Sequence, residues 1–129
     1  SPSAIEQGKK MYGQDLPLIK GDISEGLSDI GKFDIIVCYG VVGWFMDKID
    51  KCLTHIKMLL NSGGKVAISI GFSEDHRFFR DILKNEASFA KIIGRHFNVT
   101  DFIVQYLNED NSKCDLKGKE KDLIVLADM

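Results

Sequence analysis

The residues best placed to do chemistry follow an apolar run near the middle of the chain. The run, Phe33 to Val42, is nearly unbroken, which is typical of a strand buried on both faces. In open parallel sheets, ligands bind beyond the carboxyl ends of the strands. The segment Cys38 to Trp44 lies at that end of the run and is the first candidate for a binding site. Packing at the end of a strand is the alternative for the same residues.

Four further side chains have the right types for binding or proton transfer. Asp22 is a lone carboxylate directly after a glycine, and its alternative role is that of a turn or cap residue. His76 follows a second apolar run and is a candidate for a substrate pocket, a role that geometry would have to support. We expect His55 to be a surface residue of a helix. We expect His96 to mark a helix C-terminus, where positive charge is favourable.

The elements that must position these residues form a strand, helix, strand unit from Phe33 to Ile70. After the first strand comes a helix, and Gly63-Gly64 then precedes the second apolar run, Val66 to Ile70. The apolar face of the helix is formed by Ile49, Cys52, Leu53, Ile56, Leu59 and Leu60. Two runs of this kind indicate adjacent parallel strands joined by a right-handed crossover.

The segments on either side extend this unit. Ser1 to Gly13 is predicted to be a helix capped by Ser1 and ended by its glycine. Leu16 to Lys20 is a candidate for a short strand. Further along, Phe78 to Leu83 and Phe89 to Ile93 have helical spacing of apolar residues.

The C-terminal part predicts two strands, Val99 to Leu107 and Leu123 to Ala127. They are joined by a charged loop without a helix, so they must be antiparallel if they pair. The predicted fold class is therefore α/β, with a Rossmann-like, mostly parallel sheet, flanking helices and a C-terminal antiparallel hairpin. We expect a single domain over residues 1–129.

Composition is that of an ordinary globular protein. The 129 residues are 44% hydrophobic and 28% charged, with a formal net charge of −2. This charge gives no reason to expect a nucleic acid or a membrane as partner, and no apolar run approaches the roughly 20 residues needed to span a bilayer. Three cysteines, among them Cys38 and Cys52, lack metal-ligand spacing. Cys38 and Cys52 are expected to be small core residues in a reducing compartment, and hence we expect a cytoplasmic protein without a metal site.

The order and spacing of several stretches resemble the class I S-adenosylmethionine-dependent methyltransferases. Phe33 to Asp47, FDIIVCYGVVGWFMD, is similar to the fourth strand of that family and the loop after it. Leu59 to Lys65, LLNSGGK, resembles the helix end and glycine turn before the fifth strand. Ser1 to Glu6 resembles the helix after the second strand, and Gly21 to Ile23 the end of the third. The terminal hairpin also matches, because the seventh strand of the family is antiparallel.

The resemblance implies S-adenosylmethionine as cofactor and assigns residues to it. Asp22 would accept a hydrogen bond from the adenine amino group, and Ile23 would pack on the adenine ring. Cys38, Tyr39 and Gly40 would lie along the methionine part, where a glycine permits close approach of the backbone. Turn formation and strand-end packing remain the alternatives for these five residues.

The resemblance also implies methyl transfer to a small-molecule acceptor. A sulfonium methyl is already a strong electrophile, so positioning of the acceptor can supply most of the acceleration. Many family members carry Glu-His after the fourth strand, where this chain has Gly43-Trp44 and no obvious proton acceptor. The candidate acceptor-binding residues are Val42, Trp44, which could wall an apolar pocket, and His76. No catalytic residue is assigned.

Part of the family pattern has no counterpart in the chain. The glycine-rich cofactor loop and the first two strands are not found, and the chain does not begin with Met. We therefore expect an N-terminally truncated domain in which the Phe33 strand is an exposed edge. That edge is expected either to pair with a second copy of the chain or to be covered by a rearrangement that brings the first strand against it.

Two functional hypotheses stay open. In the first, the chain is the C-terminal portion of a methyltransferase and need not be competent alone. In the second, it is a non-catalytic module that self-associates through the exposed strand edge. A different doubly wound α/β protein, such as a dehydrogenase-like domain, is disfavoured because the chain has no GxGxxG turn.

Overall fold

The computed structural model describes residues 1–73, 86–106 and 120–129 of the chain. Its helices, including the short 3-10 helices η1 and η2, and its strands are α1 (Pro2–Tyr12), η1 (Ser28–Ile30), β1 (Phe33–Cys38), η2 (Val42–Lys48), α2 (Ile49–Met58), β2 (Leu60–Ser73), α4 (Glu86–Gly94), β3 (Asn98–Tyr106) and β4 (Glu120–Asp128). The predicted helical stretch from Phe78 to Leu83 lies outside the described residues.

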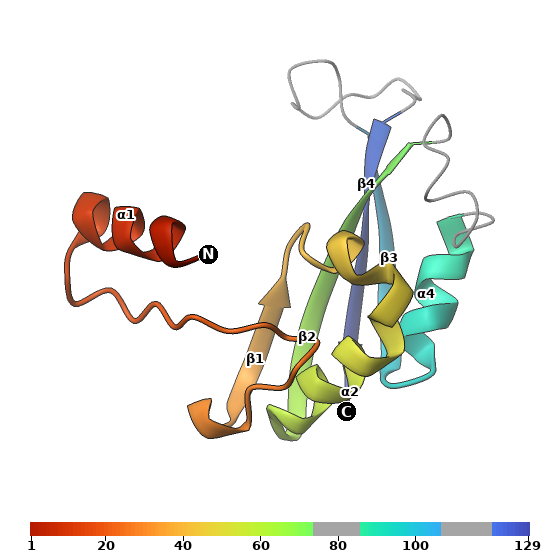
Figure 1. Cartoon of the computed structure of the whole chain (residues 1–129). Coiled ribbons are helices and arrows are strands. Elements are labelled where there is room, and N and C mark those ends of the chain that lie inside the picture. The colour runs from red at the N-terminus through yellow and green to blue at the C-terminus, as the bar shows by residue number, and fades with distance from the viewer. Residues whose placement is uncertain (74–85, 107–119) are drawn as a thin grey trace.

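The strands form one mixed sheet in the order β1-β2-β4-β3 (Figure 1). β1 and β2 are parallel, with Val37 opposite Ala67, as the strand, helix, strand unit predicted. β4 is antiparallel to both of its neighbours, so β1, β2 and β3 point one way and β4 the other. The predicted α/β fold with a C-terminal antiparallel hairpin is confirmed.

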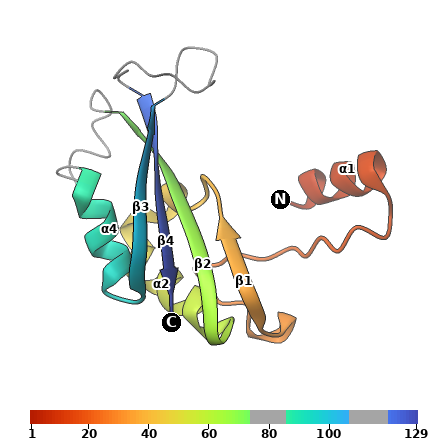
Figure 2. The same ribbon diagram turned by 180° about the vertical axis from the view of Figure 1, so that it is seen from behind.

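The core lies between one face of the sheet and the helices. Figure 1 and Figure 2 show α2 and α4 on the same side of the strands. Side chains of a strand alternate between the two faces of the sheet. In β2 and β4 every second side chain is buried in the core: Val66, Ile68, Ile70, Leu123, Val125 and Ala127. Phe89 and Ile93 of α4 close the core from above the sheet.

The predicted apolar face of α2 is confirmed. Ile49, Cys52, Leu53 and Ile56 are buried on this face. Leu59 and Leu60 are buried as well, but Leu59 follows the last residue of α2 and Leu60 begins β2, so the predicted helix was two residues too long. The four positions in α2 recur at the three- and four-residue intervals that place side chains on one side of a helix. This face fixes α2 over β1 and β2, and α2 in turn carries the residues that contact the candidate site.

Gly63 and Gly64 lie near the start of β2, a few residues after the end of α2. Gly63 has φ 75°, a conformation that side chains other than glycine rarely adopt. At Gly64 a Cβ would lie 2.8 Å from the backbone oxygen of Asn61. The pairing of β1 with β2 shifts at this place, from Phe33 opposite Leu60 to Ile35 opposite Lys65.

The N-terminal helix is as predicted but contributes nothing to the core. The Ser1 hydroxyl accepts a hydrogen bond from the amide of Ala4 at 3.2 Å, and Gly13 ends the helix with φ 116°. No residue of α1 is buried. Figure 1 shows α1 standing apart from the sheet, at the end of an extended segment.

The predicted strand from Leu16 to Lys20 is wrong. The segment is extended, but it pairs with no strand among the described residues. A strand needs a neighbour to satisfy its backbone groups. Here the amide of Leu18 instead donates to the carbonyl of Leu16 at 2.8 Å, and Pro17 has no amide hydrogen to offer.

β1 forms one end of the sheet, as the sequence predicted for the Phe33 strand. Its residues Ile35 and Val37 are 68% and 66% exposed. They point to the face opposite the helices, whereas Ile36 and Cys38 pack against the core. The prediction that this strand is buried on both faces is therefore wrong. The described part of the chain therefore presents an apolar strand with a free side.

Truncation of the core side of α2 should destabilise the protein strongly. Leu53 is 0% exposed and Met58, on the same helix, is 60% exposed. We expect Leu53→Ala to lower the free energy of unfolding by about 2–5 kcal/mol, because it leaves a cavity. Met58→Ala should change it by no more than about 0.5 kcal/mol. Urea unfolding followed by circular dichroism measures both, and equal effects would contradict this assignment of the core.

Candidate functional site

Asp22 organises a tight turn ahead of β1. Its Oδ1 accepts hydrogen bonds from the amide and the hydroxyl of Ser24, at 2.8 and 2.7 Å. The amide of Glu25 donates to the carbonyl of Asp22 at 3.0 Å. Ser24 is only 1% exposed, so its hydroxyl needs this partner. Asp22 therefore forms a turn, which is the alternative role that the sequence left open for it.

The same contacts set the charge of Asp22. Hydrogen bonds from the hydroxyl and amide of Ser24 lower the pKa of the carboxyl, and Lys48 and Lys51 add a smaller favourable field. Asp22 is therefore ionised at neutral pH. Because both bonds from Ser24 end on Oδ1, Oδ2 is the oxygen that remains for a ligand.

Ile23 is held on both its side chain and its backbone. The side chain packs against the core, the alternative that the sequence left open beside a contact with adenine. Its carbonyl oxygen lies 2.6 Å from Nδ1 of His55 in α2. The prediction that His55 is a plain surface residue is therefore wrong, because its ring is partly buried and hydrogen-bonded.

Cys38 lies on the helix side of β1, next to the buried Cys52 of α2. Burial raises the pKa of the Cys38 thiol, and Cys52 adds to the shift. Burial also raises the pKa of Cys52, with the Asp22 carboxylate as the next cause. Both thiols are therefore protonated at neutral pH, and both are core residues as predicted. Ile23, next to Asp22 in the chain, and Cys38 both pack against the core on the helix side of the sheet.

Tyr39, the residue after β1, points to the opposite face of the sheet, where its partner Asp122 lies next to the buried Leu123 in β4. It is 64% exposed, and its hydroxyl donates to Oδ2 of Asp122 in β4 at 2.7 Å. This bond raises the pKa of the phenol. Tyr39 thus bridges the end of β1 to β4 across the open face of the sheet, away from the Asp22 turn.

Gly40 lies in the turn that leaves β1. It has φ 67°, and its amide donates to the hydroxyl of the buried Ser69 in β2 at 2.9 Å. A Cβ at this position would meet no atom within 4 Å. The backbone conformation therefore requires glycine here, and the open space leaves room for the close approach that was predicted.

Of the three predicted acceptor-binding residues, only Val42 has a side chain that the structure describes. Val42, the first residue of η2, is buried in the core. Trp44 lies in η2, but its side chain is outside the description, and His76 lies outside the described residues altogether. Their contact with an acceptor stays a prediction.

Two residues of the site were not found from the sequence. The contact of Ser24 could have been predicted, because an Asx turn joins an Asp to a residue two positions later, and Asp22-Ile23-Ser24 fits that pattern. No sequence pattern indicates the contact of His55. Only folding brings His55 to Ile23, 32 positions earlier in the chain.

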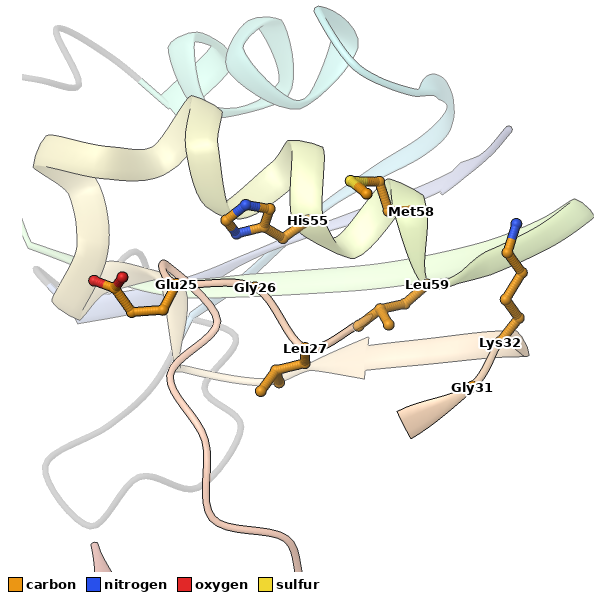
Figure 3. Close-up of a pocket in the computed structure, with 8 residues that line it drawn as sticks. All are labelled: Glu25, Gly26, Leu27, Gly31, Lys32, His55, Met58 and Leu59. Carbon is orange, nitrogen blue, oxygen red and sulfur yellow. The ribbon is translucent and has the colours of Figure 1, made fainter. Parts of the chain in front are cut away.

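A hollow of about 520 Å³ lies below the turn (Figure 3). It separates α2 from the segment that leads into β1. Three of the residues that line it are ionisable, namely Glu25, Lys32 and His55. The others are Gly26, Leu27, Gly31, Met58 and Leu59. Figure 3 shows His55 reaching from α2 toward the segment that carries Glu25 and Gly26.

Within residues 1–73, 86–106 and 120–129, no group of three or more His, Cys, Asp or Glu side chains is arranged to hold a metal ion. In the same ranges, no helix combines the length and apolar character that crossing a membrane requires.

Removal of the Ser24 hydroxyl should raise the pKa of Asp22 toward its ordinary value of 3.8, because that hydroxyl is the largest cause of the shift. A lowered pKa in the folded state stabilises the fold above the ordinary value, and this contribution is lost as pH falls through the folded pKa. Ser24→Ala should therefore show a smaller acid-induced loss of stability from Asp22. NMR titration of the Asp22 carboxyl measures the pKa. The exposed Ser62→Ala is the control, and an unchanged Asp22 pKa in Ser24→Ala would contradict the assignment.

Several solved structures with a similar fold are methyltransferases. The N-methyltransferase NodS from Bradyrhizobium japonicum WM9 superposes with a TM-score of 0.70 at 16% identity, covering 99% of this chain and 68% of that one. Its complex with S-adenosyl-L-homocysteine gives 0.67 at 17% identity, covering 99% and 62%. An S-adenosylmethionine-dependent methyltransferase from Clostridium acetobutylicum gives 0.63 at 17% identity, covering 99% and 70%. At these identities the likeness shows the fold. No curated protein sequence matches the chain.

The methyltransferase domain family matches residues 1–68 of the chain. The matched part runs from α1 into β2, and it contains the Asp22 turn and the end of β1. S-adenosylmethionine is the cofactor that this match and the S-adenosyl-L-homocysteine complex support. Because the match covers more than half of the 129 residues, the chain belongs to the methyltransferase domain family.

Proposed function

We propose that the chain is part of a cytoplasmic S-adenosylmethionine-dependent methyltransferase that acts on a small-molecule acceptor. The observation that carries this proposal is the Asp22 turn. It holds an ionised carboxylate with one free oxygen, in the part of the chain that matches the methyltransferase family.

Asp22 would bind the adenine end of the cofactor. Its Oδ2 is an acceptor for the adenine amino group, and a hydrogen bond to a charged acceptor is stronger than a neutral one. Ser24 fixes Oδ1, so the carboxylate meets the ligand with its orientation already set. Preorganisation of this kind reduces the entropy lost on binding.

The end of β1 would border the methionine part. Gly40 leaves open space above its backbone, and the neighbouring Cys38 thiol is protonated, so it adds no negative charge. When bound, the cofactor supplies an electrophilic methyl group. The chain contributes positioning, because Gly43-Trp44 offers no general base after β1.

Further contacts would come from polypeptide on the free side of β1. The chain spans about two thirds of the NodS chains that it matches. We infer that the 129 residues form a truncated domain and supply one side of the cofactor site.

Substitution of Asp22 by asparagine isolates its ligand contact. In Asp22→Asn the amide oxygen can still accept from Ser24, but the amide nitrogen replaces the free acceptor. We expect calorimetry with S-adenosyl-L-homocysteine to show binding to the wild-type chain and affinity weakened about tenfold or more in the variant.

Asp29→Asn in η1 is the matched control, because Asp29 is an exposed carboxylate close in sequence. Equal affinity of Asp22→Asn and wild type would contradict the role of Asp22. Absence of binding by the wild-type chain would favour the second candidate function.

The second candidate is a non-catalytic module that self-associates through β1. The free side of β1 and its exposed apolar residues Ile35 and Val37 favour this candidate. A strand with unpaired backbone groups is a template for pairing with another chain, and lysine on such a strand opposes pairing.

Light scattering coupled to size exclusion tests the pairing. We expect the wild-type chain to be a dimer and Ile35→Lys/Val37→Lys to be a monomer. Ile103→Lys is the control, because Ile103 is also exposed but lies on β3 at the other end of the sheet. A wild-type monomer at high concentration would rule out pairing through β1.

A further inference from the structure

We propose that His55 is a positioning residue for the Asp22 turn. Its ring holds the backbone of Ile23, and this contact sets the orientation in which the Asp22 carboxylate meets a ligand. The consequence for cofactor binding rests on the proposed function, whereas the positioning of the turn does not.

The hydrogen bond defines which ring nitrogen acts. Nδ1 lies 2.6 Å from the Ile23 carbonyl oxygen, and a carbonyl can only accept, so Nδ1 carries the hydrogen. Both the neutral ring in this form and the charged ring keep that N–H. The contact therefore does not depend on the protonation of Nε2.

One rigid unit links His55 to Asp22. The carbonyl of Ile23 and the amide of Ser24 belong to the same planar peptide group. His55 bonds the oxygen of that group, and Asp22 Oδ1 bonds its N–H at 2.8 Å. Rotation of the peptide plane would break both bonds, so the position of the ring constrains the position of the carboxylate.

The turn has no other hydrogen bond to a distant element in the described part of the chain. The bonds among Asp22, Ser24 and Glu25 are local and leave the turn free to move as a whole. The preceding segment is in no sheet that would fix its register. Packing of Ile23 and the bond from His55 therefore hold the turn in place.

The ring of His55 is itself held firmly. It projects from α2, whose Cys52 and Ile56 are buried in the core. On one side lies Gly26, where a Cβ would stand 3.6 Å from the imidazole atoms. Figure 3 shows the ring above this part of the segment. The helix, the ring and the turn thus form a continuous support.

Two substitutions separate the hydrogen bond from the bulk of the side chain. In His55→Asn the side-chain amide can place an N–H where Nδ1–H stands, whereas His55→Leu keeps similar volume without a donor. Met58→Leu, which lines the same hollow from the same helix, is the control. Circular dichroism and thermal unfolding establish that each variant is folded.

The first readout is hydrogen exchange of the Ser24 and Glu25 amides, measured by NMR. We expect exchange about tenfold faster in His55→Leu, the effect of losing one hydrogen bond. His55→Asn should restore the wild-type rate, and the amides of β2 and β4 should not change. Unchanged exchange at Ser24 and Glu25 in His55→Leu overturns the proposal.

The second readout is the affinity for S-adenosyl-L-homocysteine by calorimetry. If the wild-type chain binds, a loss of about tenfold in His55→Leu with recovery in His55→Asn supports the positioning role. Equal affinity of His55→Leu and wild type overturns it. If the wild-type chain does not bind, cofactor binding by this chain alone fails, and hydrogen exchange decides whether His55 holds the turn.

Discussion

Burial of one face of the sheet against α2 and α4 is the constraint on which the rest of the structure depends. The apolar residues of α2 and the alternate residues of β2 and β4 exclude water from a single layer. Everything near the candidate site is attached to this layer: the end of β1 through its pairing with β2, and the Asp22 turn through His55. The open face of the sheet has no such cover in the described part of the chain.

The alternation of side chains along β1 divides the predicted site. Cys38 faces the core beside Cys52, and Tyr39 faces away and bonds Asp122. The two residues are neighbours in the sequence, yet only Cys38 shares a side of the sheet with Ile23, the residue after Asp22. A ligand that contacted all of them would have to pass over the end of β1, where Gly40 leaves open space.

The electrostatics of the site are simple. Asp22 is ionised because Ser24 stabilises the charged form of the carboxyl. The thiols of Cys38 and Cys52 are neutral because burial disfavours the thiolate form. This arrangement suits recognition of a hydrogen-bond donor at one end of a ligand and close packing at the other. It provides orientation more than acid or base chemistry, as the proposed role in methyl transfer requires.

The sequence by itself determined the parts of the protein that depend on local pattern. The spacing of apolar residues predicted α2, and two apolar runs predicted β1 and its parallel pairing with β2. The charged loop without a helix predicted the terminal hairpin. The prediction of a strand at Leu16–Lys20 was wrong, because a strand forms only where a partner strand satisfies its backbone groups. No local pattern reveals whether that partner is present. The contact of His55 with Ile23 and the bond of Tyr39 to Asp122 were likewise decided only by the tertiary structure. Each joins residues that are distant in sequence, so their meeting depends on how the helix and strands pack rather than on the residues between them.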